Sequence, residues 1–300
     1  GIASAYDVLF HYSSNLNIPI ENRLITKNLF VSNASKELNS LGLDNREYMT
    51  TRKYKGDIHF RQGTTTAISS TSSFALTNCI STLVEVRGVG IKKTSFKRRV
   101  MSTFYVGMSY IKTADENFVK VKSAVKNISN YNNDIVVKAK PKIKNITIKA
   151  IDIAENKKID LDILMQDLHD LDVEIARKRP IGYLVPKSLD DVIERLDLLG
   201  VEMSEVDNEI EVIAEKYLVT DYFKDPVKYE GIYKQEISTE LITEETKLTN
   251  DYFVVNLNQN HSNLAVEVLE PETVSSFVTF DVVKTELDQI LPYFRIIEYK

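Results

Sequence analysis

The residue with the clearest chemical potential is a glutamate inside an apolar stretch. Residues 81–90 read STLVEVRGVG, in which apolar and β-branched residues on both sides of Glu85 predict a buried strand that ends at two glycines. A carboxylate inside such a strand costs free energy unless it is paired, neutralised or used in a reaction. The sequence therefore leaves a catalytic and a structural interpretation of Glu85 open.

The two interpretations differ in what the carboxylate faces. As a catalytic group, Glu85 would be a general base or acid on a central strand, directed at a cleft where it activates water. As a structural group, it would form an ion pair with Arg87, because residues two apart in a strand point to the same face. The pattern alone favours the ion pair, since strand carboxylates paired with arginine are common.

Metal-ligand spacing is missing from this chain. The four histidines, His11, His59, His169 and His261, have no second histidine or glutamate three residues further on, the spacing typical of a catalytic zinc site. His169 lies among acidic residues in QDLHDLD, which favours a solvated patch. The single Cys79 excludes an internal disulfide and a thiolate zinc cluster. We therefore predict no metal ligands within these residues.

Composition excludes several classes of partner. The 300 residues carry a net charge of −5, which gives no reason to expect nucleic acid or an anionic membrane as a partner. No apolar run approaches the ~18 residues of a membrane span. No phosphate-binding glycine motif occurs, and the basic run KKTSFKRR alternates with apolar residues, as on a solvated helix face. The compartment stays open between cytoplasm and periplasm.

Three zones differ in their periodicity. Residues 1–114 mix helix and strand patterns, residues 115–178 carry a linking β segment, and residues 179–300 predict a β-rich domain with one helix at 188–199. In the first zone, residues 21–43 predict a helix that stops at Gly42, and residues 48–73 predict a long Thr/Ser-rich loop. A helix after Ser95 shows an apolar stripe that predicts its core-facing side: Phe96, Val100, Phe104, Met108 and Ile111.

Several stretches resemble one known family in order along the chain. CISTLVEVRGVG followed by FKRRV is similar to the end of the catalytic domain of zinc metallocarboxypeptidases of the carboxypeptidase A-like group. YDVLFHYSSNLNIP, LGLDNREYMTT and FALTNCISTLVEVRGVGIKKTSFKRRV resemble bacterial members, and RPIGYLVPKSLDDVIERLDLLGVEM and NLAVEVLEPETVSSFV resemble their C-terminal extension. The resemblance implies an α/β fold: the C-terminal part of a mixed, mostly parallel sheet with flanking helices, followed by a β-rich accessory domain.

The resemblance also implies roles. Zinc and Glu85 would activate the water that attacks a C-terminal peptide bond of a peptide or protein substrate, and Arg87 would orient Glu85. Positions in the pocket segment that correspond to family residues are Thr71, Ser72, Thr77 and Asn78, of which only Asn78 matches the family pattern. Two arginines of that pattern are missing, which weakens recognition of a substrate carboxylate. The zinc ligands of the family lie upstream of the matched region, so zinc is expected in an intact parent.

Two hypotheses follow. In the first, the chain is the C-terminal portion of an active metallocarboxypeptidase, processed or cut from something longer because it starts at Gly1. In the second, it is a catalytically inactive carboxypeptidase-like binding or scaffold protein. Under either, we expect unpaired sheet surface that associates with a second copy or with the upstream part of the same protein.

Overall fold

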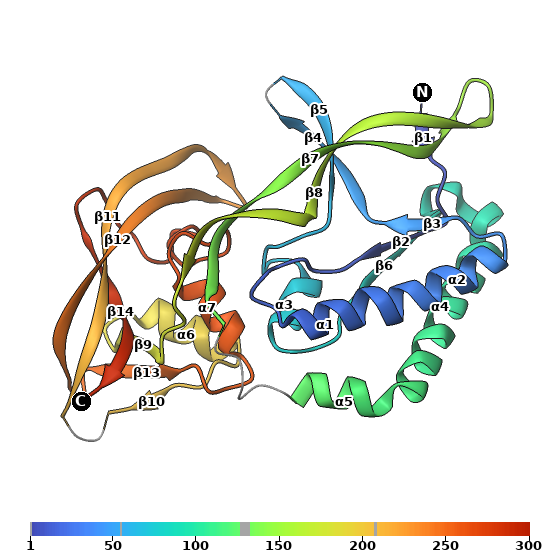
Figure 1. Ribbon diagram of the computed structural model, residues 1–300. Helices are drawn as coiled ribbons and strands as arrows, with labels where there is room; N and C mark the ends of the chain where they lie inside the picture. The colour runs from blue at the N-terminus through green and yellow to red at the C-terminus, as the bar shows by residue number, and fades with distance from the viewer. Residues whose placement is uncertain (1, 55, 127–132, 207–208) are drawn as a thin grey trace. The chain divides into compact units, whose positions relative to one another are not determined.

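The computed structural model describes residues 2–54, 56–126, 133–206 and 209–300 and has a mixed α/β fold with three sheets (Figure 1). The chain forms two compact units, and the first consists of residues 1–65, 69–126 and 139–172. The second consists of residues 66–68, 127–138 and 173–300. These units divide the chain differently from the three predicted zones, because most of the predicted linking segment belongs to the first unit.

The three-stranded sheet of the first unit carries Glu85. Its order is β3-β2-β6, with β2 parallel to β3 and antiparallel to β6: β3 (Asn45–Glu47), β2 (Val8–His11) and β6 (Leu83–Val86). This sheet is mixed, as the resemblance implies, with one parallel and one antiparallel pair, and a mostly parallel sheet stays a prediction; antiparallel pairs predominate in the other two sheets. One face of this sheet packs against helices, in a core that contains Val8, Phe10, Leu38 and Val106.

The predicted helix over residues 21–43 is confirmed, with a π-helical turn in its middle. It consists of α1 (Ile20–Ile25), η1 (Thr26–Val31) and α2 (Ser32–Ser40). Gly42 follows with φ of 70°, a left-handed conformation that favours glycine and ends the helix, as predicted. The remaining helices of the unit are α3 (Ser70–Leu76), η2 (Val89–Ser95), α4 (Phe96–Glu116) and α5 (Phe118–Lys126).

The predicted loop over residues 48–73 is wrong. Most of it forms a β-hairpin and the start of α3, because Thr, Tyr and Ile suit a pleated strand. The hairpin joins a five-stranded sheet of order β1-β7-β8-β5-β4: β1 (Ile2–Ser4), β7 (Ile135–Asp152), β8 (Lys157–Arg177), β5 (Asp57–Gln62) and β4 (Met49–Tyr54). Strand β7 lies within residues 115–178, the zone predicted to carry a β segment.

The second unit is built on a six-stranded sheet of order β10-β13-β9-β14-β11-β12. Its strands are β10 (Ser204–Glu205), β13 (Tyr252–Asn256), β9 (Gly182–Pro186), β14 (Ile290–Tyr299), β11 (Ile210–Tyr229) and β12 (Ile232–Leu248). Its helices are α6 (Asp190–Leu198), predicted as residues 188–199, and α7 (Ser262–Leu269). All eight residues of α7 are buried. Residues 275–283, within the zone predicted to be β-rich, instead form a series of turns and bends.

The helix after Ser95 is confirmed as α4, but its predicted core-facing side is wrong. The apolar stripe faces solvent, with Phe96 61% and Ile111 65% exposed, while Ser102 and Ser109 are buried. The hydrophobic pattern therefore predicted the position of the helix correctly and its buried side incorrectly. No helix of the described chain has both the length and the apolar character that crossing a membrane requires.

Candidate functional site

The position of Glu85 follows from strand alternation. On β6, Glu85 is opposite Leu9 of β2, and Leu83 is opposite His11. Paired residues point to the same side of a sheet, so these four side chains share one face, while Val84 joins the helix-covered core on the other. Glu85 is therefore exposed, and the prediction that it is buried is wrong.

Arg87 does not act as the predicted ion-pair partner. It is exposed and lies beyond the end of β6, where its backbone N–H donates to the Asp7 carbonyl oxygen over 2.8 Å. The described residues contain no ion pair between Glu85 and Arg87. The structural interpretation that the pattern favoured thus lacks its contact.

Tyr48 lies near Glu85, and His11 is on the same face of the sheet as Glu85. The backbone N–H of Tyr48 donates to the Phe10 carbonyl oxygen over 2.8 Å, and the Tyr48 ring centroid lies 4.9 Å from that of His11. Partial burial, and secondly the negative charge of Glu85, raise the pKa of the Tyr48 hydroxyl. Burial, and secondly His169, lower the pKa of His11, against a backbone hydrogen bond involving Gly63 that raises it. His11 is therefore a neutral imidazole at pH 7.

A second set of polar residues lies on the opposite side of β2. Tyr12 donates to Glu47, Gln62 Nε2 donates to Glu47 Oε2 over 2.5 Å, and the His169 ring lies 4.7 Å from the Tyr12 ring. The His169 side chain is only 11% exposed, so the solvated patch predicted around it is wrong. Its Nε2 lies 3.0 Å from where a Cβ on Gly63 would be, which restricts this turn to glycine.

An apolar cavity of about 330 Å³ adjoins the Glu85 face. Leu9, the direct partner of Glu85, lines it, as does Met49, the neighbour of Tyr48. The wall is completed by residues of β1, β4, β5, β7 and β8: Ala3, Ser4, Thr50, Thr51, Phe60, Ile148, Lys149, Ala150 and Leu161. A cavity of about 330 Å³ with mostly apolar walls lies in the size range of small-molecule sites, so it is a candidate binding site.

The four residues predicted to contact substrate gather on α3 and at its C-terminal end. Thr71, Ser72 and Asn78 are buried, and Thr77 Oγ1 donates to the Phe74 carbonyl oxygen over 2.9 Å. Ser72 Oγ donates to Ser13 Oγ over 2.7 Å, two residues after His11. Ser72 thus contacts the segment that follows β2, and the contact of all four residues with substrate stays a prediction.

A zinc site does not form from the described residues alone. They contain no group of three or more His, Cys, Asp or Glu side chains that could hold a metal ion. His11 places one imidazole on the same face of the sheet as Glu85, whereas a catalytic zinc takes three protein ligands. Any zinc bound beside Glu85 would require ligands from outside the described residues.

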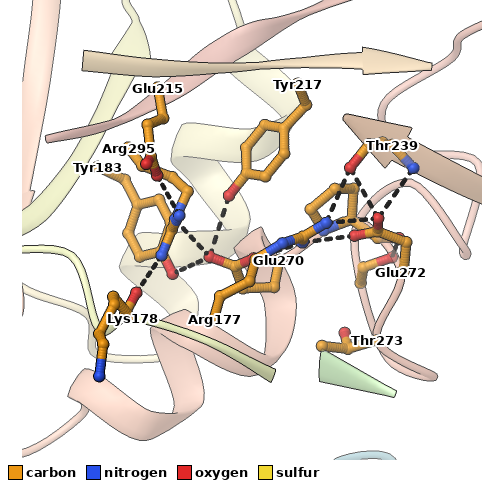
Figure 2. A network of polar contacts seen from close by, with 12 residues as sticks. Arg177, Lys178, Tyr183, Glu215, Tyr217, Thr239, Glu270, Glu272, Thr273 and Arg295 are labelled. Carbon is orange, nitrogen blue, oxygen red and sulfur yellow. Dashed lines mark hydrogen bonds and ion pairs between the residues drawn. The ribbon is translucent and has the colours of Figure 1, made fainter. Parts of the chain in front are cut away.

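The second unit contains a buried ion network that sequence reasoning missed (Figure 2). Glu270 Oε1 accepts from the hydroxyls of Tyr183 and Tyr217 over 2.8 Å and 3.0 Å, and Oε2 accepts from Arg177 Nη1 over 2.8 Å. Arg177 Nη2 also donates to Glu272 Oε1 over 2.6 Å. Arg295 contacts Glu270, Glu215 and the Lys178 carbonyl oxygen.

The pKa shifts in this network keep the arginines charged and the tyrosines protonated. Burial lowers the pKa of Arg177, but hydrogen bonds and charges from Glu272 and Glu270 more than offset it, so the pKa is raised. Burial, and secondly the Glu270 charge, raise the pKa of Tyr183 well above its usual value. The network is closed to solvent, since Glu270 and Arg295 are 0% and 1% exposed. The network therefore has a structural role within the second unit.

Comparison with known proteins supports a carboxypeptidase-like character. The chain is 28% identical to Carboxypeptidase 2 of Trichophyton rubrum over 297 residues, which cover 97% of this chain and 55% of that protein. It is 28% identical to Carboxypeptidase 2 of Trichophyton equinum over 300 residues (98% and 56%) and to a probable carboxypeptidase 2 of Arthroderma benhamiae over 277 residues (91% and 53%).

The share of each relative that the chain covers limits the conclusions that these matches support. The chain spans about half the length of the curated relatives it matches. The relatives named here are fungal, so they do not support the bacterial detail of the resemblance. No family model matches the chain, and no solved structure matches it. The comparisons thus suggest a carboxypeptidase family and leave the metal and the mechanism to be proposed.

Proposed function

We propose that this chain is part of a carboxypeptidase-like peptidase in which Glu85 is the general base and acid. The observation that supports this most directly is the placement of Glu85: exposed on the face of β6 that shares Leu9 with the apolar cavity. A base must reach water and substrate, which a buried ion-paired glutamate cannot do. The similarity to proteins named carboxypeptidase 2 supplies the reaction class.

In this proposal each group near the face has one task. Glu85 takes a proton from the attacking water and passes it to the leaving amine. Tyr48 shields one side of the carboxylate and supplies a protonated hydroxyl, because its pKa is raised. The cavity beside Leu9 and Met49 receives the side chain of the C-terminal residue of the substrate. Zinc, which the resemblance implies, requires further ligands, so no step is assigned to it.

The test is the Glu85→Gln variant in the longest natural polypeptide that contains these residues. We expect kcat/KM on an N-blocked dipeptide with an apolar C-terminal residue to fall by several orders of magnitude, because the amide has lost its basicity. The matched control is Glu21→Gln, an exposed carboxylate in the first turn of α1. Undiminished hydrolysis by Glu85→Gln would remove the role assigned to Glu85.

The alternative is a carboxypeptidase-like binding or scaffold protein without catalysis. It is favoured by the two arginines missing from the segment that contains Thr71, Ser72, Thr77 and Asn78, because recognition of a carboxylate relies on bidentate guanidinium contacts. Calorimetric titration of zinc and of C-terminal peptides into the same polypeptide separates the two. Peptide binding without turnover supports the alternative, and tight zinc binding with turnover excludes it.

A further inference from the structure

The turn at Gly63 lies between strand β8 and the end of strand β2. Strand β5, which pairs with β8 in parallel, ends at Gln62. One residue after Gly63, Thr64 forms a parallel bridge with Ser13, and Ser13 follows His11 by two residues. The packing of β8 against this turn can therefore affect the position of His11.

The side chain of β8 that packs against the turn is His169. The three heavy atoms nearest to a Cβ built on Gly63 all belong to the His169 imidazole, and Nε2 is the closest at 3.0 Å. The ring centroid of His169 lies 4.7 Å from that of Tyr12, and its Nε2 lies 3.7 Å from Glu47 Oε2. The His169 ring thus has three close neighbours, one of which is the turn.

The turn in turn binds His11. Burial and the charge of His169 lower the pKa of His11, and a hydrogen bond with the Gly63 backbone raises it. A hydrogen bond raises the pKa of an imidazole when the ring donates, so the acceptor is the Gly63 carbonyl oxygen. A neutral imidazole has one donor nitrogen and one acceptor nitrogen. The bond to Gly63 therefore selects one of the two neutral tautomers of His11.

We propose that His169 is a positioning residue that fixes a single neutral tautomer of His11 through the Gly63 turn. His11 shares its face of the three-stranded sheet with Glu85. The tautomer decides which ring nitrogen can accept a hydrogen bond, and thus what His11 can bind on that face. The effect on hydrolysis rests on the function proposed above, whereas the effect on the tautomer does not.

NMR of the ring nitrogens tests the tautomer in the longest natural polypeptide that contains these residues, labelled at histidine. At pH 7 we expect the His11 ring, assigned with His11→Gln, to show one protonated and one unprotonated nitrogen. His169→Ala should give averaged nitrogen shifts, because the Gly63 turn then loses the ring that packs against it. His169→Phe keeps an aromatic ring beside Tyr12 and should restore the original pattern.

Leu168→Ala is the matched control. Leu168 is 1% exposed on β8, and its side chain points to the opposite side of the strand from that of His169. This change should weaken the packing of β8 and leave the His11 tautomer unchanged. In the peptidase assay, kcat/KM should fall at least ~10-fold for His169→Ala and stay within about threefold of the original for His169→Phe and Leu168→Ala.

The two readouts keep this proposal separate from the proposed function. Averaged His11 shifts in the unchanged protein, unaltered shifts in His169→Ala, or the same averaging in Leu168→Ala would each overturn the positioning role. Averaged shifts with an unchanged kcat/KM in His169→Ala would overturn its part in hydrolysis. If the polypeptide hydrolyses no peptide, the proposed function fails, and the ring shifts still decide whether His169 positions His11.

Discussion

Glu85 lies on strand β6 and Glu270 directly follows helix α7, and the two carboxylates differ in exposure and in hydrogen bonding. Glu85 is exposed on an edge of a small sheet, with the Tyr48 ring as its neighbour and no ion pair to a described residue. Glu270 is 0% exposed and accepts hydrogen bonds from Tyr183, Tyr217 and Arg177. A carboxylate that acts as a base needs lone pairs that are free to accept a proton. In a carboxylate that stabilises a core, the lone pairs already accept hydrogen bonds.

The contrast between Glu85 and Glu270 shows that burial and ion pairing do not identify a reactive carboxylate in this chain. The Glu270 network has the shorter contacts and the stronger pKa shifts, yet solvent cannot reach it. The Glu85 face has weaker contacts and an adjoining cavity of about 330 Å³. Accessibility next to a cavity is the feature that separates the two.

The largest effect is expected from removing the charge of Glu270. Glu270→Gln leaves Arg177 and Arg295 buried with fewer compensating charges, so we expect the second unit to lose about 3–5 kcal/mol of unfolding free energy. Urea unfolding followed by hydrogen-exchange mass spectrometry of peptides from β9 and β11 measures it. The control is Glu230→Gln, a change in the turn between β11 and β12. A loss below about 1 kcal/mol would mean that the network does not fasten the unit.

A smaller effect is expected from pH in the first unit. Burial is the largest cause lowering the pKa of both His11 and His169, so between their folded and unfolded pKa values the unfolded state binds more protons. Stability should therefore increase as the pH rises through about 6.5, the unfolded value, and fall below it. The groups that face them are each other, Glu47, Lys27, Asp167 and the Gly63 backbone.

The measurement is urea unfolding at several pH values between about 5 and 8, followed through exchange of peptides from β2. His11→Gln with His169→Gln should flatten the dependence. His261→Gln, a change in the second unit, is the control. An unchanged slope in the double variant would show that other groups carry the pH dependence.

Local pattern predicted much of the fold, and packing decided the rest. Helices α1, α2, α4 and α6 and strand β6 follow from periodicity and from the glycine stop at Gly42, and the strands after residue 134 lie in the zones predicted to be rich in β-structure. The orientation of α4 could not be predicted, because periodicity shows that a stripe exists without showing what covers it. Helix α7 was not predicted, and all eight of its residues are buried, the polar Ser262, Asn263 and Glu267 included.

The site was predicted in part. Glu85 was found because a charge interrupts an apolar run, but its exposure depends on the pairing with β2, which the run itself does not contain. Tyr48 lies near Glu85 across 37 residues of the chain, and its ring packs against His11 across another 37, separations that single-sequence reasoning does not reach. The ion network of Glu270 likewise joins segments that are 53 and 93 residues apart.

The smallest expected effect is the coupling energy between Glu85 and Arg87, which distinguishes the surroundings of Glu85 directly from those of the buried ion network. A double-mutant cycle of Glu85→Gln and Arg87→Ala should give single changes within about 0.5 kcal/mol and a coupling energy near zero, because the two exposed side chains form no ion pair. The matched cycle, Arg177→Met and Glu272→Gln, should give a coupling of about 1–3 kcal/mol, because Arg177 Nη2 lies 2.6 Å from Glu272 Oε1. Urea unfolding measures both cycles. A coupling above about 0.5 kcal/mol between Glu85 and Arg87 would revive the structural interpretation of Glu85, since a glutamate held by its arginine is less available as a base.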